Sequence, residues 1–207
     1  MRIGRGTAAA GLGFLVAAGM SGAWAQLPPG VYAGAPSLKE APAGAYGLDP
    51  DHTAVIVKVS HIGYALSVFR FGKVSGTLQW NPADPARSSL KAVVHTVSIE
   101  TPVEGFGKAL AGPGYLDADR FPDASFVSTA FRPSDATHGM VTGDFTLRGH
   151  THPLTFAVTL AGAGRGFMGH PRIGVEAKAA FAPEDYGLAA MFGPKIRVEI
   201  DAEFEAS

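Results

Sequence analysis

The sequence contains no cysteine among its 207 residues. This absence excludes a disulfide framework, a thiolate zinc site, a thiol nucleophile and a cysteine-ligated iron–sulfur cluster. Charge is also scarce, because only 17% of the residues are charged and the formal net charge is -1. Without a broad basic surface, the chain is not expected to bind nucleic acid. The 46% of hydrophobic residues instead predicts a folded core.

The amino terminus has the features of a secretory signal peptide over residues 1–25. Arg2 and Arg5 precede a short apolar run, and small residues follow at Ala23 and Ala25. This order of features predicts export to the periplasm with cleavage after Ala25. A retained membrane anchor is the less favoured alternative, because the apolar run is short and rich in Gly and Ala.

After the predicted cleavage site, residues 26–45 are rich in Pro, Ala and Gly and are expected to be a flexible lead-in. The folded part is predicted to be a single domain over residues 46–207, which is long enough for a sizeable core.

Within that domain, apolar and polar residues alternate with a period of two, which is typical of half-buried strands. The last segment shows this most clearly, because Ile196, Val198 and Ile200 alternate with charged residues. One short helix is expected over residues 103–111. Short connections favour an all-β antiparallel barrel of about eight strands, which removes exposed sheet edges. Strands are expected near residues 54–60, 66–71, 73–81, 88–101, 125–132, 141–148, 154–160, 173–181 and 196–205.

Motifs that could carry chemistry are few. Gly164–Gly169 matches GxGxxG, but strands are expected on both sides, so a hairpin loop is favoured over a dinucleotide site. His150 and His152 could form a metal-binding pair, but no third ligand is evident nearby. Because there is also no GxSxG motif, we predict neither a catalytic centre nor a metal site.

Aromatic side chains recur on the expected strands and connections. Core packing explains any single one of them, but a barrel of this size can also hold one apolar ligand. The candidate lining residues are Phe69, Phe71, Trp80, Phe106, Phe126, Phe145, Phe156, Phe181, Tyr186 and Phe192.

Several segments, in this order and spacing, resemble the YceI-like family of exported bacterial proteins, described as polyisoprenoid-binding. The similarity runs from about Tyr46 to Phe204 and is strongest in GDFTLRGHTHP, residues 143–153. The other matching segments are Asp49 and His52 in LDPDHTAV, Val59–Gly63, Phe71, Ser75–Leu78, Val97–Thr101, Leu110, Tyr115–Asp117, Phe121–Pro122, Phe126 and Ser128–Thr129.

The resemblance implies a lipocalin-like barrel that carries or sequesters a long isoprenoid or an isoprenoid quinone in an apolar tunnel, without a cofactor. It adds Leu110 and Tyr115 to the candidate ligand-binding residues. His61 and Tyr64, together with His52, are candidates for hydrogen bonds to a quinone or phosphate head group. The family is commonly dimeric, and a lipid carrier leaves open transient contact with the membrane or with membrane redox proteins.

The sequence departs from the family pattern at Ala109, where His is frequent, and at Pro183, where Arg is expected. Both departures remove polar groups that could recognise a head group. Two alternatives to a soluble carrier stay open. An integral outer-membrane barrel has the same alternation, although such proteins usually end on an aromatic residue and this sequence ends in EFEAS. An exported hydrolase or metal-binding protein would need residues that are distant in the sequence.

Overall fold

The structure is a computed structural model that describes residues 34–166 and 168–207. The expected signal peptide and the first residues of the expected lead-in lie outside this part. Among the described residues, the strands are β1 (Gly44–His61), β2 (Ala65–Phe71), β3 (Val74–Trp80), β4 (Ser89–His95), β5 (Ile99–Glu100), β6 (Asp123–Pro133), β7 (His138–Leu147), β8 (His150–Arg165), β9 (Pro171–Phe181) and β10 (Ile196–Ala206). The helical segments are η1 (Leu38–Glu40), η2 (Pro85–Arg87), η3 (Thr96–Ser98), α1 (Phe106–Ala111), η4 (Pro183–Tyr186) and η5 (Ala190–Phe192).

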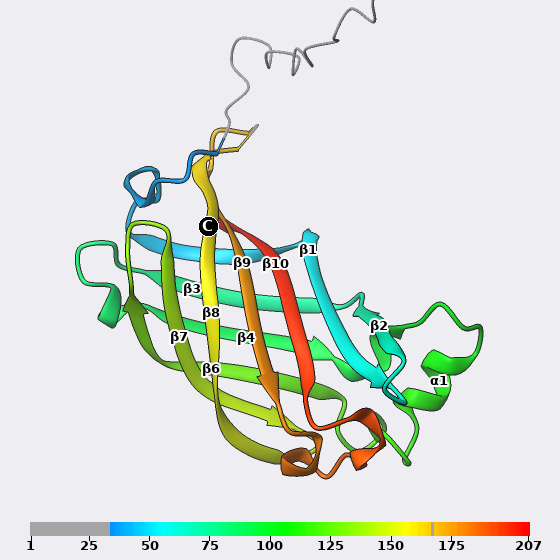
Figure 1. The fold of residues 1–207 in the computed structure, drawn as a ribbon. Coiled ribbons are helices and arrows are strands. Elements are labelled where there is room, and N and C mark those ends of the chain that lie inside the picture. The colour runs from blue at the N-terminus through cyan, green and yellow to red at the C-terminus, as the bar shows by residue number, and fades with distance from the viewer. Residues whose placement is uncertain (1–33, 167) are drawn as a thin grey trace, which may run out of the picture.

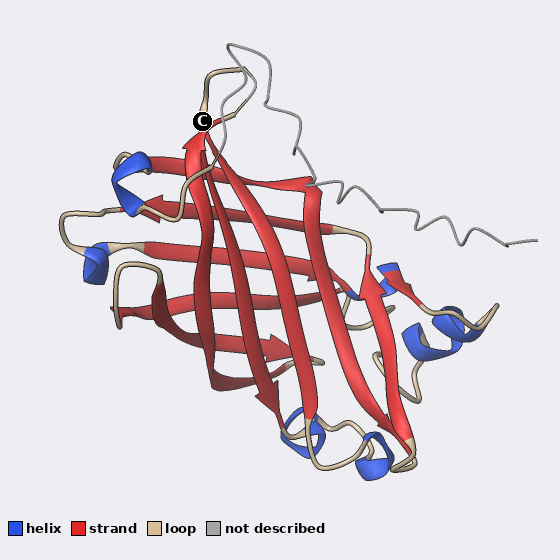
Figure 2. Cartoon of the chain, turned by 45° about the horizontal axis from the view of Figure 1, so that its top comes forward, coloured by secondary structure: helices blue, strands red, loops and turns tan. Residues whose placement is uncertain are grey.

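Eight of the strands close into an antiparallel barrel in the order β10-β9-β8-β7-β6-β4-β3-β1, and β1 pairs back onto β10. Strand β2 pairs with the second half of β1, and β5 pairs with β2. The strands form the wall of the barrel, and the short helices lie at its ends (Figure 2). The predicted all-β antiparallel barrel with a short helical segment is therefore confirmed.

Strand β1 makes closure possible because it is bent and serves two neighbours. Its first residues, Gly44–Gly47, pair with β3, whereas Val55–His61 pair with β2. Both halves pair with β10, and the register shifts between Asp49 and Ala54. Figure 1 shows the resulting turn in β1. Pro50 lies within this irregular stretch, where a missing backbone N–H disturbs no regular ladder.

The strands differ from the sequence expectation in three places, one of which is β8, which spans His150–Arg165 rather than residues 154–160. Strand β1 begins at Gly44, well before residue 54, because the turn-like Asp and Pro residues lie in its bend. The expected strand over residues 88–101 is split by η3 into β4 and β5. The split has a clear cause, since the hydroxyl of buried Thr96 donates to the backbone carbonyls of Phe121 and Pro122 at 2.8 and 2.9 Å. The GxGxxG motif begins in the last two residues of β8, next to the expected hairpin that leads to β9.

The described end of the expected lead-in lies on the barrel. Ala35 pairs with Ala163 of β8 through two backbone hydrogen bonds of 2.8 Å. The Tyr46 hydroxyl donates to the Pro42 carbonyl at 2.7 Å, and Ala41 is only 1% exposed. The folded part of the chain thus extends to Gly34. No helix in the part of the chain that the structure describes is long and apolar enough to cross a membrane.

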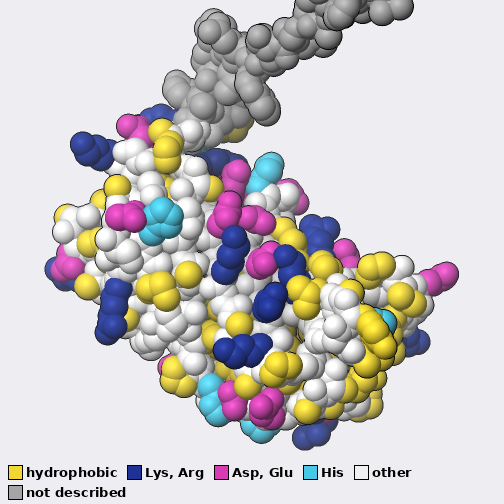
Figure 3. Space-filling model, in the orientation of Figure 1, with side chains coloured by type: hydrophobic (Ala, Val, Ile, Leu, Met, Phe, Trp, Pro, Cys, Tyr) yellow, Lys and Arg dark blue, Asp and Glu magenta, His cyan; other side chains and the backbone are white. Residues whose placement is uncertain are grey.

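An ion-pair network on the outer face ties the bend of β1 to β9 and β10. The Arg172 guanidinium donates to Asp49 Oδ2 at 2.8 Å, to Glu203 Oε2 at 2.7 Å and to the Glu205 carboxylate. His52 Nδ1 lies 2.9 Å from Asp49 Oδ2. The hydrogen bonds from His52 and Arg172 lower the pKa of Asp49 from 3.8 to about 2. Charged groups are spread over this face of the molecule (Figure 3).

We predict that Arg172→Met lowers the free energy of unfolding at pH 7 by about 2 kcal/mol, because it leaves three neighbouring carboxylates without their cation. The pKa of Asp49 is depressed in the folded chain, so its stabilising contribution is complete above pH 3.8 and is lost as the pH falls toward 2. The loss of unfolding free energy caused by Arg172→Met should therefore be smaller at pH 3 than at pH 7. Urea denaturation at the two pH values measures both effects. Arg197→Met, at an exposed β10 position, is the control, and an equal deficit at both pH values would contradict the prediction.

Candidate ligand-binding site

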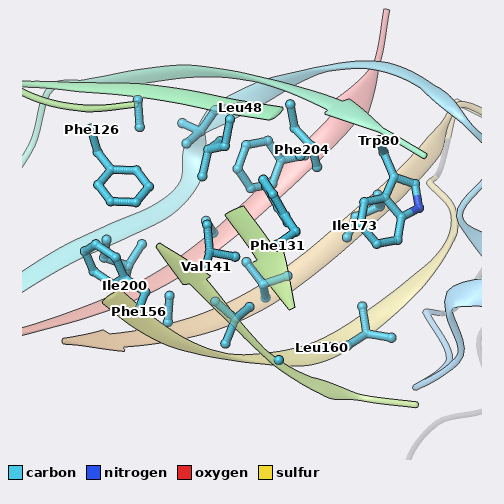
Figure 4. Close-up of a pocket in the computed structure, with 18 of the residues that line it drawn as sticks. Leu48, Trp80, Phe126, Phe131, Val141, Phe156, Leu160, Ile173, Ile200 and Phe204 are labelled. Atoms are coloured by element: carbon cyan, nitrogen blue, oxygen red, sulfur yellow. The ribbon is translucent and has the colours of Figure 1, made fainter. Parts of the chain in front are cut away.

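The interior of the barrel contains two cavities with volumes of about 210 and 150 Å³. The larger, here called the hairpin cavity, reaches the β6–β7 hairpin and is lined there by Arg132 and His138. The smaller, here called the helix cavity, reaches α1 and η5 and is lined there by Leu110 and Phe192. Residues around the hairpin cavity that Figure 4 labels are Leu48, Trp80, Phe126, Phe131, Val141, Phe156, Leu160, Ile173, Ile200 and Phe204.

The two cavities share a stretch of lining, here called the neck. Six residues line both of them, and all six are apolar: Val55, Ala92, Val94, Phe126, Phe156 and Ile200. The rings of Phe126 and Phe156 pack edge to face in the neck, with centroids 5.2 Å apart. The two cavities, together called the tunnel below, are thus neighbours with an aromatic pair at their shared wall.

Gly143 of β7 leaves room for this constriction. A Cβ atom at Gly143 would lie 2.6 Å from Phe126 Cζ and would also clash with the backbone carbonyl oxygen of Val127. Real Cβ atoms do not approach other atoms this closely. The glycine thus allows the Phe126 ring to lie across the β7 backbone.

Bulges decide which side chains enter the tunnel. The β6–β7 register shifts between Ser128 and Ala130. Consequently, Phe126 and Phe131 both line the hairpin cavity, although an odd spacing would put them on opposite faces of a regular strand. The bend in β1 has the same effect, because Leu48 and Val55 both face the hairpin cavity. Neither Phe131 nor Leu48 was among the candidate lining residues from the sequence.

Most of the candidate residues from the sequence lie around the tunnel. Trp80 lines the hairpin cavity, and Phe126 and Phe156 line both cavities. The candidates that line the helix cavity alone are Phe69, Phe71, Leu110, Tyr115, Phe145, Phe181 and Phe192. Their positions on different strands and loops agree with a site that only the closed barrel assembles.

Four candidates lie outside the tunnel lining. Phe106 packs edge to face behind Phe69, with ring centroids 6.2 Å apart. Tyr186 is 1% exposed and contacts Phe145 and Phe181, so it supports the wall. His61 and Tyr64 lie at the exposed β1–β2 turn, where Tyr64 is 89% exposed. Neither of these two residues lines either cavity.

The other candidate polar residues are also outside the tunnel. His52 belongs to the Arg172 network, and its hydrogen bond with Asp49 raises its pKa. Asp49, His52 and Glu203 form a cluster with metal-ligand spacing in the described part of the chain. Because both carboxylates already accept hydrogen bonds from the Arg172 guanidinium, we assign no metal to this cluster. His150 and His152 are exposed at the start of β8.

Comparison with known proteins finds chains with similar sequences. A family model described as the YceI-like domain matches residues 46–204. A UPF0312 protein of Shewanella sp. (strain ANA-3) is 32% identical over 155 residues, which cover 74% of this chain and 81% of the relative. A UPF0312 protein of Pseudomonas fluorescens is 33% identical over 162 residues, covering 77% of this chain and 84% of the relative.

Solved structures show the same fold at lower identity. BcnA of Burkholderia cenocepacia superposes with a TM-score of 0.67 at 21% identity, covering 75% of this chain and 98% of that protein. A polyisoprenoid binding domain from Saccharophagus degradans superposes with a TM-score of 0.61 at 15% identity, covering 80% of this chain and 100% of that domain. At these identities the superpositions support the barrel architecture itself.

We predict that Gly143→Ala destabilises the barrel by about 2 kcal/mol, because the added methyl group must displace Phe126 or the β6 backbone. Chemical denaturation measures the change. Gly47→Ala is the matched control, since Gly47 also lies in a strand and a Cβ there meets nothing within 4 Å. Equal stability of the two variants would show that the neck does not depend on Gly143.

Proposed function

The chain belongs to the YceI-like domain family, and from this membership and its apolar tunnel we propose that it is an exported protein that carries or stores a polyisoprenoid or an isoprenoid quinone. The observation that carries the proposal is the tunnel itself. It consists of two neighbouring cavities, and the residues that line both of them are all apolar. An elongated, largely hydrocarbon ligand matches this shape and chemistry.

The energetics favour a long chain. Burial of each methylene group contributes roughly 0.8 kcal/mol. Burial of a chain of about twenty carbons can therefore offset the translational and conformational entropy that the ligand loses on binding. A small polar ligand would find few partners along most of the tunnel, because the lining side chains are chiefly Val, Leu, Ile and Phe. The shared fold of the polyisoprenoid binding domain from Saccharophagus degradans supports the same ligand class.

The two faces of the barrel wall explain how the protein can hold such an apolar ligand in an aqueous compartment. The alternation in β10 directs Val198 and Ile200 to the tunnel, while Arg197 and Asp201 are exposed on the outside. The apolar cargo is thus enclosed by a polar shell. Export to the periplasm is proposed from the signal-peptide features of residues 1–25 and would place this shell between two membranes.

The direct experiment expresses the full chain with its own leader and isolates it from the periplasmic fraction. We expect organic extraction to release an isoprenoid lipid and mass spectrometry to find Gln26 as the first residue. Absence of any lipid, together with no binding of added isoprenoid quinone, would refute the ligand assignment. An intact Met1 would refute cleavage without affecting that assignment.

We also predict that Ala177→Phe lowers isoprenoid affinity at least about tenfold, because the new ring enters the hairpin cavity that Ala177 lines. Ala180→Phe is the matched control. Ala180 lies on the same strand at an exposed position outside the tunnel lining, so its replacement should leave affinity unchanged. Titration of both variants with an isoprenoid quinone tests the difference. Equal affinity of the two variants would place the ligand outside the barrel.

A further inference from the structure

The turn between β1 and β2 carries large apolar side chains that face the solvent. Ile62 is 79% exposed, and Tyr64 of the same turn is also exposed. Leu66, which follows in β2, is a third exposed apolar residue. Single exposed apolar residues are common on protein surfaces, whereas a group of neighbouring ones indicates a contact surface.

The backbone makes Ile62 an unusual residue for its position. The Tyr64 backbone N–H donates to the His61 carbonyl at 3.0 Å. The two residues between them have positive φ values, 52° for Ile62 and 81° for Gly63. Two positive φ values are typical of a type I′ turn, whose first central position favours Asn or Gly. A β-branched residue is rarely found at positive φ, because its Cβ is crowded against the backbone. Neither the turn nor the core accounts for Ile62, so we expect its side chain to make an intermolecular contact.

A second segment lies beside this turn and adds an exposed methionine. Segment η5 ends next to β1, because a Cβ atom at Gly193 would lie 2.8 Å from Ser60 Cβ. Ser60 pairs with Leu66 in the β1–β2 ladder, so these two side chains share a face. Figure 3 shows hydrophobic side chains gathered at the lower right, at the end of the barrel where Figure 1 places the β1–β2 turn and α1. We use the name apolar tip for the exposed residues Ile62, Tyr64, Leu66 and Met191.

The charged groups within the apolar tip are basic. Residues 60–66 and 191–195 contain no Asp or Glu, and their ionisable basic groups are the exposed His61 and Lys195. Carboxylates at this end of the barrel belong to η4 and to the loop before α1. Tyrosine favours the membrane–water interface, because its ring is apolar and its hydroxyl is polar. Apolar side chains flanked by a lysine are complementary to a membrane surface that carries anionic phospholipids.

The apolar tip lies beside the helix cavity. Phe192, which follows Met191 in η5, lines that cavity, and so does Val59, which precedes Ser60 in β1. At both places one residue faces the cavity and its neighbour in the chain lies outside the lining. A membrane in contact with the apolar tip would therefore lie next to the helix cavity.

The edge of β2 limits how deeply this surface can enter a bilayer. Strand β5 pairs only with Arg70 and Phe71, so residues 65–69 have no strand partner on that side in the described part of the chain. Unpaired backbone groups need water or another polar partner, which the hydrocarbon core does not supply. The apolar tip therefore matches the headgroup layer rather than the hydrocarbon core.

We propose that the apolar tip docks on the surface of a membrane that contains anionic phospholipids. Ile62, Tyr64 and Met191 enter the headgroup layer, and Lys195 lies against the lipid phosphates. The helix cavity then lies beside the bilayer. This inference rests on the proposed function, because a carrier has to exchange its isoprenoid with the membrane in which that lipid is dissolved, and it adds the place of exchange.

The test measures sedimentation of the processed chain, isolated from the periplasmic fraction, with vesicles of phosphatidylethanolamine that contain or lack phosphatidylglycerol. We expect strong binding only with phosphatidylglycerol, and weaker binding at high salt. Ile62→Asn should weaken binding at least about tenfold, because it removes an apolar side chain from the interface. Since Asn is favoured in a type I′ turn, the midpoint of urea denaturation should stay the same or rise. A loss of docking is thereby distinguished from unfolding.

Met168→Asn is the matched control. Met168 is also 79% exposed, but it lies between β8 and β9, and Figure 1 shows this connection at the end of the barrel opposite the β1–β2 turn. This variant should bind vesicles like the wild type. Loss of binding in Met168→Asn, and not in Ile62→Asn, would place the contact at the opposite end and overturn the proposal.

A second pair of variants tests the charge. Lys195→Gln should weaken binding to the anionic vesicles about fivefold, because it removes the positive charge beside the apolar tip. Lys91→Gln makes the same change at an exposed position of β4 and should have no effect. Equal binding of these two variants would contradict the role of Lys195.

Separate assays of vesicle binding and of isoprenoid binding distinguish the remaining outcomes. If the chain binds isoprenoid quinone but no vesicles, docking is refuted and the proposed function stands. If it binds vesicles through Ile62 but neither contains nor takes up an isoprenoid, the proposed function fails and the docking surface stands without its role in lipid exchange. If Ile62→Asn converts a dimer to a monomer in analytical ultracentrifugation and leaves vesicle binding unchanged, the apolar tip is an interface between two copies of this chain and the proposal is overturned.

Discussion

The architecture depends on the pairing of the first strand with the last. Strand β1 pairs with β10 along both of its halves, and this contact turns an open sheet into a barrel. A straight β1 could not meet β3 with one half and β2 with the other, so closure requires the bend between Asp49 and Ala54. Arg172 holds that bend from outside through Asp49 and Glu203. Lys58 and Glu199 add a second link between β1 and β10, at 2.5 Å.

A closed barrel does not necessarily contain a cavity, because a small barrel can fill its interior with side chains. Here small residues keep the interior open at selected places. Ala92 and Ala177 line the tunnel where larger residues would block it, and Gly143 lets Phe126 lie close to the β7 backbone. The apolar surface left unfilled is the physical basis for binding, since a hydrocarbon chain can occupy it without losing hydrogen bonds.

The sequence predicted the wall of the barrel more reliably than its lining. Period-two alternation located β10 and β9 almost to the residue, because both are regular strands with one charged face. The alternation did not place Phe131 on the inner face, because a bulge in β6 changes which side chains point inward. The local sequence pattern gives no sign of this bulge. His61 and Tyr64 were candidates by chemistry and family resemblance, but their distance from the tunnel depends on how the β1–β2 turn projects from the closed barrel.

The β1–β10 pairing also brings the beginning and the end of the barrel together. Tyr46 lies opposite Ala206, and the Ser207 backbone N–H donates to the Ala45 carbonyl at 3.1 Å. The same closed barrel could therefore form from a chain whose termini lie at a different turn. A short linker across this point would allow new termini at the exposed turn near Gly63 while keeping all of the strand pairings around the barrel. The tunnel would then be retained in a circularly permuted chain.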